Sequence, residues 1–158
     1  ADGWAFVGWP EARDYMLRKQ PASPTWDADW CRLLAERAAW LKAKDIDFVF
    51  GVVPESYTIY NEYLPRHMDR TDIPSLQDRI LAAVKDDPAV AMLDFRPALF
   101  EAKRTGADLI YQKLDGHWQD NGAYIAYAQL MRALAETNPA LAPLPLDAFT
   151  VSKVRGPG

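Results

Sequence analysis

The run Asp47-Phe48-Val49-Phe50-Gly51-Val52-Val53 constrains the fold of this chain more than any other stretch. β-Branched and aromatic residues follow one another almost without interruption, which is typical of a parallel strand that is buried on both faces. Pro54 ends the run, because proline cannot donate a hydrogen bond to a sheet ladder. We therefore expect a parallel sheet that contains this strand.

Helical and strand patterns alternate along the rest of the chain. The patterns predict, in order, a helix over 27–41, a strand over 47–53, a helix over 75–86, a strand over 90–94, a helix over 97–104, a strand over 109–112 and a helix over 119–136. This alternation predicts an α/β sandwich in which helices connect parallel strands. Three strands make a thin sheet, so either the extended patterns at 2–9 and 148–158 add strands or the chain is part of a larger domain.

The composition is that of a soluble globular domain and excludes several kinds of partner. The 158 residues carry a formal net charge of −4 without a basic run, so we expect no nucleic acid partner. The apolar stretches are too short to form a transmembrane segment. The single cysteine, Cys31, excludes an internal disulfide and a cysteine zinc cluster. The two histidines, His67 and His117, have no metal-ligand spacing, and no glycine-rich phosphate loop follows a predicted strand, so we expect neither metal nor cofactor.

A polar cluster, 114–119, separates the third predicted strand from the last predicted helix. Open α/β sheets place functional groups at such junctions, at the carboxyl edge of the strands. Asp115 lies two residues before His117 and can set the tautomer of the imidazole and stabilise its protonated form, which are the needs of a general base. In the alternative interpretation, His117 caps the last helix and Asp115 satisfies backbone N–H groups at its start.

Four further residues are candidates for substrate binding. Glu55 and Ser56 follow the strongest strand, and we expect them to line the same cleft as His117 because the carboxyl ends of parallel strands share an edge. Ser56 lacks the glycine-containing tight turn of a nucleophilic serine, so a structural role in the turn is the stronger interpretation. Trp118 and Gln119 directly follow His117 in the sequence. For Trp118, core packing is favoured over stacking on a sugar.

Several blocks of the sequence, taken together and in order, resemble the alginate O-acetyltransferase family of the AlgJ/AlgX type. The blocks are DGWAF at 2–6, the stretch from Trp40-Leu41 through the strand and Pro54 to Leu64-Pro65, DFR at 94–96, DGHW at 115–118 and GAY at 122–124. The resemblance implies an SGNH-hydrolase-like, flavodoxin-like three-layer sandwich. It also implies a periplasmic or other extracytoplasmic enzyme that moves acetyl groups onto polysaccharide hydroxyls.

By the same resemblance, Asp115 and His117 match the Asp and His of a Ser-His-Asp triad. The family's serine stands in a later Gly-Asp-Ser block that these residues lack. Gly116 replaces the usual threonine and Gln119 the usual asparagine. At 55–56 the family often has an acidic or amide residue followed by lysine, whereas this chain has Glu55-Ser56.

The favoured function is therefore an O-acetyltransferase whose partners are a polysaccharide, an acyl donor and other envelope polysaccharide-assembly proteins. The alternatives are a carbohydrate acetyl esterase and a non-catalytic carbohydrate-binding or scaffold domain. Residues 1–158 are expected to be a single SGNH-like domain or its N-terminal part, and Ala1-Asp2-Gly3 indicates a processed or cloned fragment. Without a convincing nucleophile, the chain alone is not expected to turn over acetyl esters.

Overall fold

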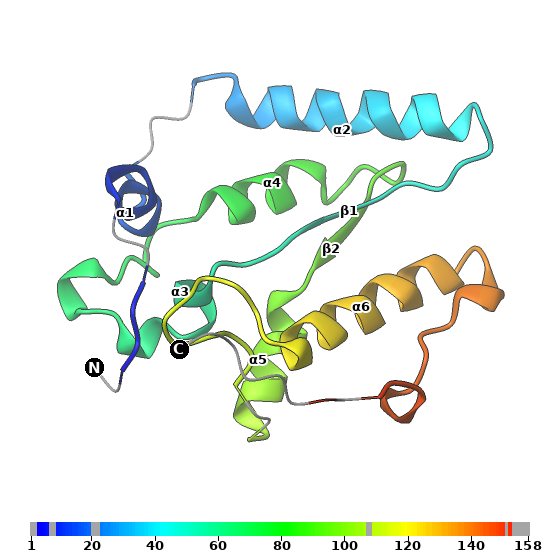
Figure 1. Ribbon diagram of the computed structural model, residues 1–158. Coiled ribbons are helices and arrows are strands. Elements are labelled where there is room, and N and C mark those ends of the chain that lie inside the picture. The colour runs from blue at the N-terminus through cyan, green and yellow to red at the C-terminus, as the bar shows by residue number, and fades with distance from the viewer. Residues whose placement is uncertain (1–2, 7–8, 20–22, 107–108, 151, 153–158) are drawn as a thin grey trace.

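A parallel sheet lies between two layers of helices in the computed structural model (Figure 1). The structure describes residues 3–6, 9–19, 23–106, 109–150 and 152. In this part of the chain the sheet has two strands, β1 (Val49–Val52) and β2 (Ala91–Asp94), paired in parallel from Val49 opposite Ala91 to Val52 opposite Asp94. Helices α2 (Trp26–Lys42) and α4 (Leu76–Val84) form one layer, and α5 (Arg96–Arg104) and α6 (Asp120–Ala135) form the other. The predicted three-layer α/β arrangement is confirmed.

All four predicted helices are present within a few residues of their expected ends. A capping box opens α4: the Ser75 hydroxyl accepts from the backbone N–H of Asp78, and the Asp78 carboxylate accepts from the backbone N–H of Ser75. Such a box satisfies N–H groups that a helix cannot satisfy internally, which fixes where the helix begins.

Short elements that periodicity did not predict fill the connections. Helix α1 (Pro10–Met16) precedes α2, and α3 (Ser56–Ile59) follows β1. Four 3₁₀ turns complete the described chain: η1 (Asn61–Tyr63), η2 (Arg66–Met68), η3 (Pro139–Leu141) and η4 (Leu146–Ala148).

The predicted third strand at 109–112 is wrong. Only Tyr111 makes a ladder contact there, an isolated antiparallel bridge to Trp118. The chain turns back on itself, since the Gln112 N–H donates to the His117 carbonyl at 3.0 Å and the Gln119 N–H donates to the Ile110 carbonyl at 2.7 Å. The apolar character of this stretch instead reflects burial among helices: Ile110 and Tyr111 are 0% and 1% exposed.

The extended patterns at the two ends add no strand among the described residues. Residues 3–6 have no regular secondary structure, and residue 148 belongs to η4. Residues 2, 7, 8, 151 and 153–158 of these two segments lie outside the described part of the chain.

Two apolar clusters hold the layers together. One joins α2 and α4 to the strands through Leu34, Ala38, Ile80, Val84 and Val90. The other joins α3, α5, the 110–111 segment and α6 through Ile59, Tyr60, Phe95, Leu99, Ile110, Tyr111 and Ala126. Burial of such side chains contributes roughly 1.5–3 kcal/mol each. The second cluster therefore anchors the base of the polar loop at 112–117.

Candidate active site

The polar loop between Tyr111 and Trp118 is fixed at its base by contacts with distant segments. The Tyr111 hydroxyl donates a short hydrogen bond to the Pro54 carbonyl, which ties the loop to the carboxyl end of β1. On the other side, the backbone N–H of Ala5 donates to the Lys113 carbonyl at 2.8 Å. These bonds place the loop beside the end of β1 although no strand leads into it.

Gly122, in the first turn of α6, allows the helix to approach the base of this loop closely. A Cβ atom added there would lie 2.6 Å from the Ile110 carbonyl oxygen and 3.0 Å from the Trp118 Cβ. A side chain therefore does not fit unless the helix or the loop moves. The glycine of the GAY block thus has a packing role: it lets α6 lie against the loop that carries His117.

Asp115 and His117 form the hydrogen-bonded pair that their spacing predicts. The imidazole Nδ1 lies 2.6 Å from the Asp115 Oδ1, and the His117 backbone N–H donates to the same oxygen at 3.1 Å. The side-chain hydrogen bond, followed by the backbone one, lowers the pKa of Asp115. An ionised carboxylate at Nδ1 favours the tautomer with its proton on Nδ1 and leaves Nε2 as the basic atom. The His117 side chain is 82% exposed, so Nε2 is accessible to a reacting group.

Glu55 lies within electrostatic reach of this pair. Burial raises the pKa of its carboxyl group, and the nearby His117 opposes that rise. The nearness of Glu55 to the His117 loop does not come from the predicted shared strand edge, and His117 is not among the residues that line the cleft beside Glu55. This nearness comes from the bond between Tyr111 and Pro54, because Pro54 precedes Glu55 in the chain.

The other candidate binding residues lie as follows. Ser56 is the first residue of α3 and is only 3% exposed, so it does not share a cleft with His117 as expected. Trp118 is half-buried and packs against the second apolar cluster, in line with the favoured core role. Gln119 is exposed and is the N-cap residue of α6, without a side-chain capping bond.

A cleft of about 580 Å³ opens beside Glu55. Its walls come from the end of α1, the turn after β1 and the amino end of α4. Its polar lining residues include Tyr15, Arg18, Glu55, Tyr57, Gln77 and Arg79. Burial, and then the charge of Glu55, raises the pKa of the Tyr57 phenol, while Arg18 opposes that rise. The volume is typical of a small-ligand pocket.

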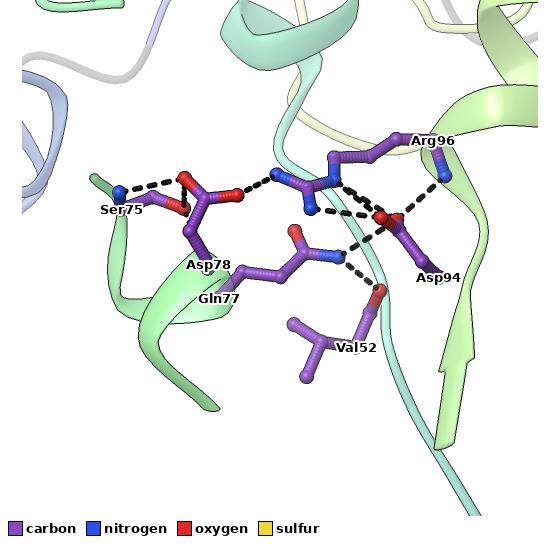
Figure 2. A network of polar contacts seen from close by, with 6 residues as sticks. All are labelled: Val52, Ser75, Gln77, Asp78, Asp94 and Arg96. Carbon is purple, nitrogen blue, oxygen red and sulfur yellow. Dashed lines mark hydrogen bonds and ion pairs between the residues drawn. The ribbon is translucent and has the colours of Figure 1, made fainter. Parts of the chain in front are cut away.

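A polar network centred on Arg96 lies where the ends of the two strands meet the start of α4 (Figure 2). The guanidinium donates to both Asp94 oxygens at 2.8–3.1 Å and to an Asp78 oxygen at 2.5 Å. Gln77 donates to the Val52 carbonyl at 3.3 Å and to Asp94 at 3.4 Å. The network therefore joins the carboxyl ends of both strands to the first turn of α4.

The charges of the network stabilise one another. The hydrogen bonds that Arg96 donates to Asp94 and Asp78 raise the pKa of its guanidinium, although burial opposes the rise. Burial by itself would raise the pKa of Asp78, but hydrogen bonds from Ser75 and Arg96 together lower it. The DFR block at 94–96 was the sequence signal for this network, although residue patterns alone did not indicate its partners Gln77 and Asp78.

The serines of the described chain are not placed to serve His117. Ser75 is engaged in the capping box, Ser23 bonds to Thr25, and Ser56 is buried. Ser152 lines a separate hollow with Tyr124 and Phe149. Within the described residues, none of these hydroxyls forms a hydrogen bond with the imidazole.

The described residues contain neither a metal-binding cluster nor a membrane-spanning helix. No group of three or more His, Cys, Asp or Glu side chains in this part of the chain is arranged to hold a metal ion. None of the helices described is both long enough and apolar enough to cross a membrane.

Comparison with known proteins gives consistent matches. A family model described as the SGNH hydrolase-like domain of the acetyltransferase AlgX matches residues 1–156. A probable alginate O-acetylase AlgJ from Pseudomonas fluorescens is 31% identical over 99 residues, which are 63% of this chain and 25% of that protein. The solved O-acetyltransferase domain of Pseudomonas putida AlgJ matches with a TM-score of 0.61 at 22% identity, over 86% of this chain and 46% of that one. These matches confirm the predicted fold, and the chain spans about a quarter and just under half of the lengths of the two relatives.

Proposed function

We propose that this chain, which belongs to the family of SGNH hydrolase-like acetyltransferase domains of the AlgX type, is part of an O-acetyltransferase that modifies an alginate-type polysaccharide outside the cytoplasmic membrane. The hydrogen-bonded Asp115–His117 pair with an accessible Nε2 is the observation that carries this proposal. The names of the two relatives, an alginate O-acetylase and an O-acetyltransferase domain, support the choice of reaction and acceptor.

The proposed reaction has two acyl transfers that share one base. A serine hydroxyl attacks the carbonyl of an acetyl donor while His117 Nε2 takes its proton, and Asp115 stabilises the resulting imidazolium. The donor's leaving group departs with that proton, and the acetyl group remains on the serine. A sugar hydroxyl then gives its proton to Nε2 and attacks the acetyl-serine. The serine leaves with the proton from His117, and the sugar keeps the acetyl group.

We propose that the nucleophilic serine comes from a segment outside these 158 residues. The serines of the described chain are bonded elsewhere, buried or part of a separate hollow. The family model matches almost the whole chain, yet the chain spans less than half of the solved relative. A segment that brought a serine to Nε2 would also cover the exposed imidazole, which would exclude water from the reaction.

An acetyl esterase remains the second candidate, because the same pair would serve it with water as the acceptor. The exposure of His117 is the observation that favours hydrolysis. Acetyl transfer and hydrolysis differ only in which hydroxyl attacks the acetyl-serine, so product analysis separates them.

The decisive experiment compares the complete natural protein with its His117→Ala and Asp115→Asn variants. Acetyl release from a chromogenic ester and acetylation of a polyuronate are measured together. Loss of a general base costs roughly 10²–10⁴-fold in rate, and we expect His117→Ala to lose that much in both assays. His67→Ala is the matched control, because His67 is the other histidine and lies on the exposed turn η2. Full acetyl transfer by the His117→Ala variant would overturn the proposal. Acetyl release by the wild-type protein without acetylation of the polyuronate would favour the esterase.

The 158-residue chain is assayed beside the complete protein. We expect it to turn over the ester no faster than its own His117→Ala variant, because the acyl-enzyme route needs the missing serine. Turnover by the short chain that depends on Ser56 would instead make Ser56 the nucleophile.

A further inference from the structure

Arg18 occupies an unusual position at the mouth of the cleft beside Glu55. It directly follows Leu17, the C-cap residue of α1, and its φ is 55°, in the left-handed region. Helices usually carry glycine at this position, because any side chain is strained there. An arginine does not relieve the backbone strain at this position, so its side chain is a candidate for a functional role.

The guanidinium of Arg18 is buried in part without being satisfied. Its Nε is buried and has no hydrogen-bond partner among the described residues. The side chain lines the cleft, and its charge acts on the Tyr57 phenol across it. A buried N–H of a charged group is costly when it is unpaired, and an anion in the cleft that bound this guanidinium would offset that cost.

The other charged groups of the cleft make Arg18 the cation that is free for a ligand. Arg79 is occupied, because two of its nitrogens donate to the two Asp27 oxygens at 2.9 Å and its guanidinium lies 4.8 Å from the centre of the Trp26 ring. Glu55 is the acidic group of the cleft, and in the described chain no ion pair joins it to Arg18. Glu55 directly follows Pro54, which accepts the hydrogen bond from Tyr111 at the base of the His117 loop, so the cleft lies beside that loop.

We propose that this cleft is an acceptor subsite in which Arg18 binds the carboxylate of a uronate unit of the polysaccharide. The inference rests on the proposed function, since it assigns the part of the acceptor that lies beside the transferred acetyl group. A planar guanidinium suits a carboxylate, with which it forms two parallel hydrogen bonds. The hydroxyls of Tyr15 and Tyr57 supply partners for sugar hydroxyls. Glu55 in the same cleft disfavours a doubly charged anion such as phosphate.

The test measures binding of a uronate oligosaccharide to the complete protein by calorimetry, with no acetyl donor present. Arg18→Gln should raise the Kd at least tenfold. Arg37→Gln, the matched control, removes the same charge from an exposed position on α2 and should change the Kd less than twofold. Asp27, which pairs with Arg79 of the cleft, lies ten residues from Arg37 on the same helix. That is about 15 Å along the helix axis, so Arg37 lies away from the cleft. A carboxyl-reduced, neutral oligosaccharide should bind the wild type and Arg18→Gln equally.

A second variant separates ligand binding from folding. Arg18→Gly removes the side chain and relieves the left-handed backbone, so its Tm should equal or exceed that of the wild type while uronate binding is lost. A lower Tm with unchanged binding would show a structural Arg18 and overturn the inference. An equal loss of binding in Arg37→Gln would also overturn it, since it would reveal general charge attraction. If acetate or inorganic phosphate competes as strongly as the oligosaccharide, the cleft is a simple anion site and not a sugar subsite.

The two proposals fail in different ways. Arg18-dependent binding without His117-dependent transfer would refute the proposed function alone. Transfer to the polymer that is unaffected by Arg18→Gln, in both Kd and KM, would refute the uronate subsite alone.

Discussion

Replacing Gly122 with alanine tests whether close packing of α6 positions the catalytic loop. Alanine is favoured over glycine inside a helix by roughly 1 kcal/mol, so propensity alone predicts a stabler protein. The structure predicts the opposite, because the new Cβ would lie 2.6 Å from the Ile110 carbonyl oxygen, where ordinary contact begins at 3.4 Å. Helix α6 or the loop must therefore move by about 0.8 Å, the difference between these two distances. Overpacking of this kind costs about 1–3 kcal/mol.

The net result for Gly122→Ala is an expected loss of about 0–2 kcal/mol in the free energy of unfolding, after the propensity gain is subtracted. The larger effect should be on activity. The movement strains the bond from the Gln119 N–H to the Ile110 carbonyl, which is 2.7 Å long and closes the His117 loop. A displacement near 1 Å at a catalytic group costs on the order of 10²-fold in rate.

Denaturant unfolding and acetyl transfer are measured on the same preparations, with Gly106→Ala as the control. Gly106 has a φ of 78° and nothing within 4 Å of an added Cβ, so alanine there strains the backbone without a clash. It should cost about 1–2 kcal/mol in stability and leave the transfer rate unchanged. A Gly122→Ala protein that is stabler than wild type and fully active would refute the packing argument.

Three further predictions concern the contacts around the site. Arg96→Met should lower the free energy of unfolding by about 3–5 kcal/mol in denaturant melts, because Asp94 and Asp78 would lose their shared partner; Arg96→Lys should rescue little of it, since an ammonium lacks the planar fork. His117→Ala should raise the pKa values of both Asp115 and Glu55 in carboxyl NMR titrations, because His117 lowers each of them; an unchanged Glu55 titration would contradict their proximity. Tyr111→Phe should cost about 1–3 kcal/mol, because the Pro54 carbonyl loses its hydrogen bond, whereas Tyr124→Phe, which breaks an exposed bond, should cost less than 1 kcal/mol.

The pH dependence of the Glu55 contribution has a definite sign. Its folded-state pKa lies above the ordinary value of 4.5, so folding favours the protonated carboxyl group. The stability that protonation adds is fully present below the unfolded-state pKa and is lost as the pH rises through the folded-state value. Replacement by glutamine should therefore stabilise the protein at neutral pH relative to wild type, and the difference should disappear in acid.

Local patterns predicted the helices and the two paired strands because periodicity is a local property. Helix α4 combines a capping box at Ser75 with apolar residues that reach the α2 face, and both features are visible within a dozen residues. Helix α1 escaped prediction because it is short and buries only Met16. In the wrongly predicted strand at 109–112, Ile110 and Tyr111 are buried as expected, but helices cover them instead of strands. An apolar run does not reveal which of the two will cover it.

The candidate site also has one part that the sequence predicted and another that it did not. Asp115 and His117 are two residues apart, so their hydrogen bond could be predicted from the sequence. The Arg96 network joins residues that lie up to 44 positions apart, from Val52 to Arg96, and it exists only because the two strands pair in parallel. Arg18 reaches the cleft through the fold of α1, which the sequence pattern did not show.

The loop that carries His117 and the cleft beside Glu55 come from different segments and meet at the end of β1. The loop at 112–117 rests on Tyr111, Trp118 and α6, whereas the cleft is built from α1, the turn after β1 and α4. Pro54 accepts the bond from the loop, and the next residue, Glu55, lines the cleft. Changes in the loop and in the cleft that do not involve residues 54–55 should therefore combine additively, because such residues share no partner. Coupling should appear only in pairs that include residues 54–55, where a shift of the chain moves the base and the bound sugar together.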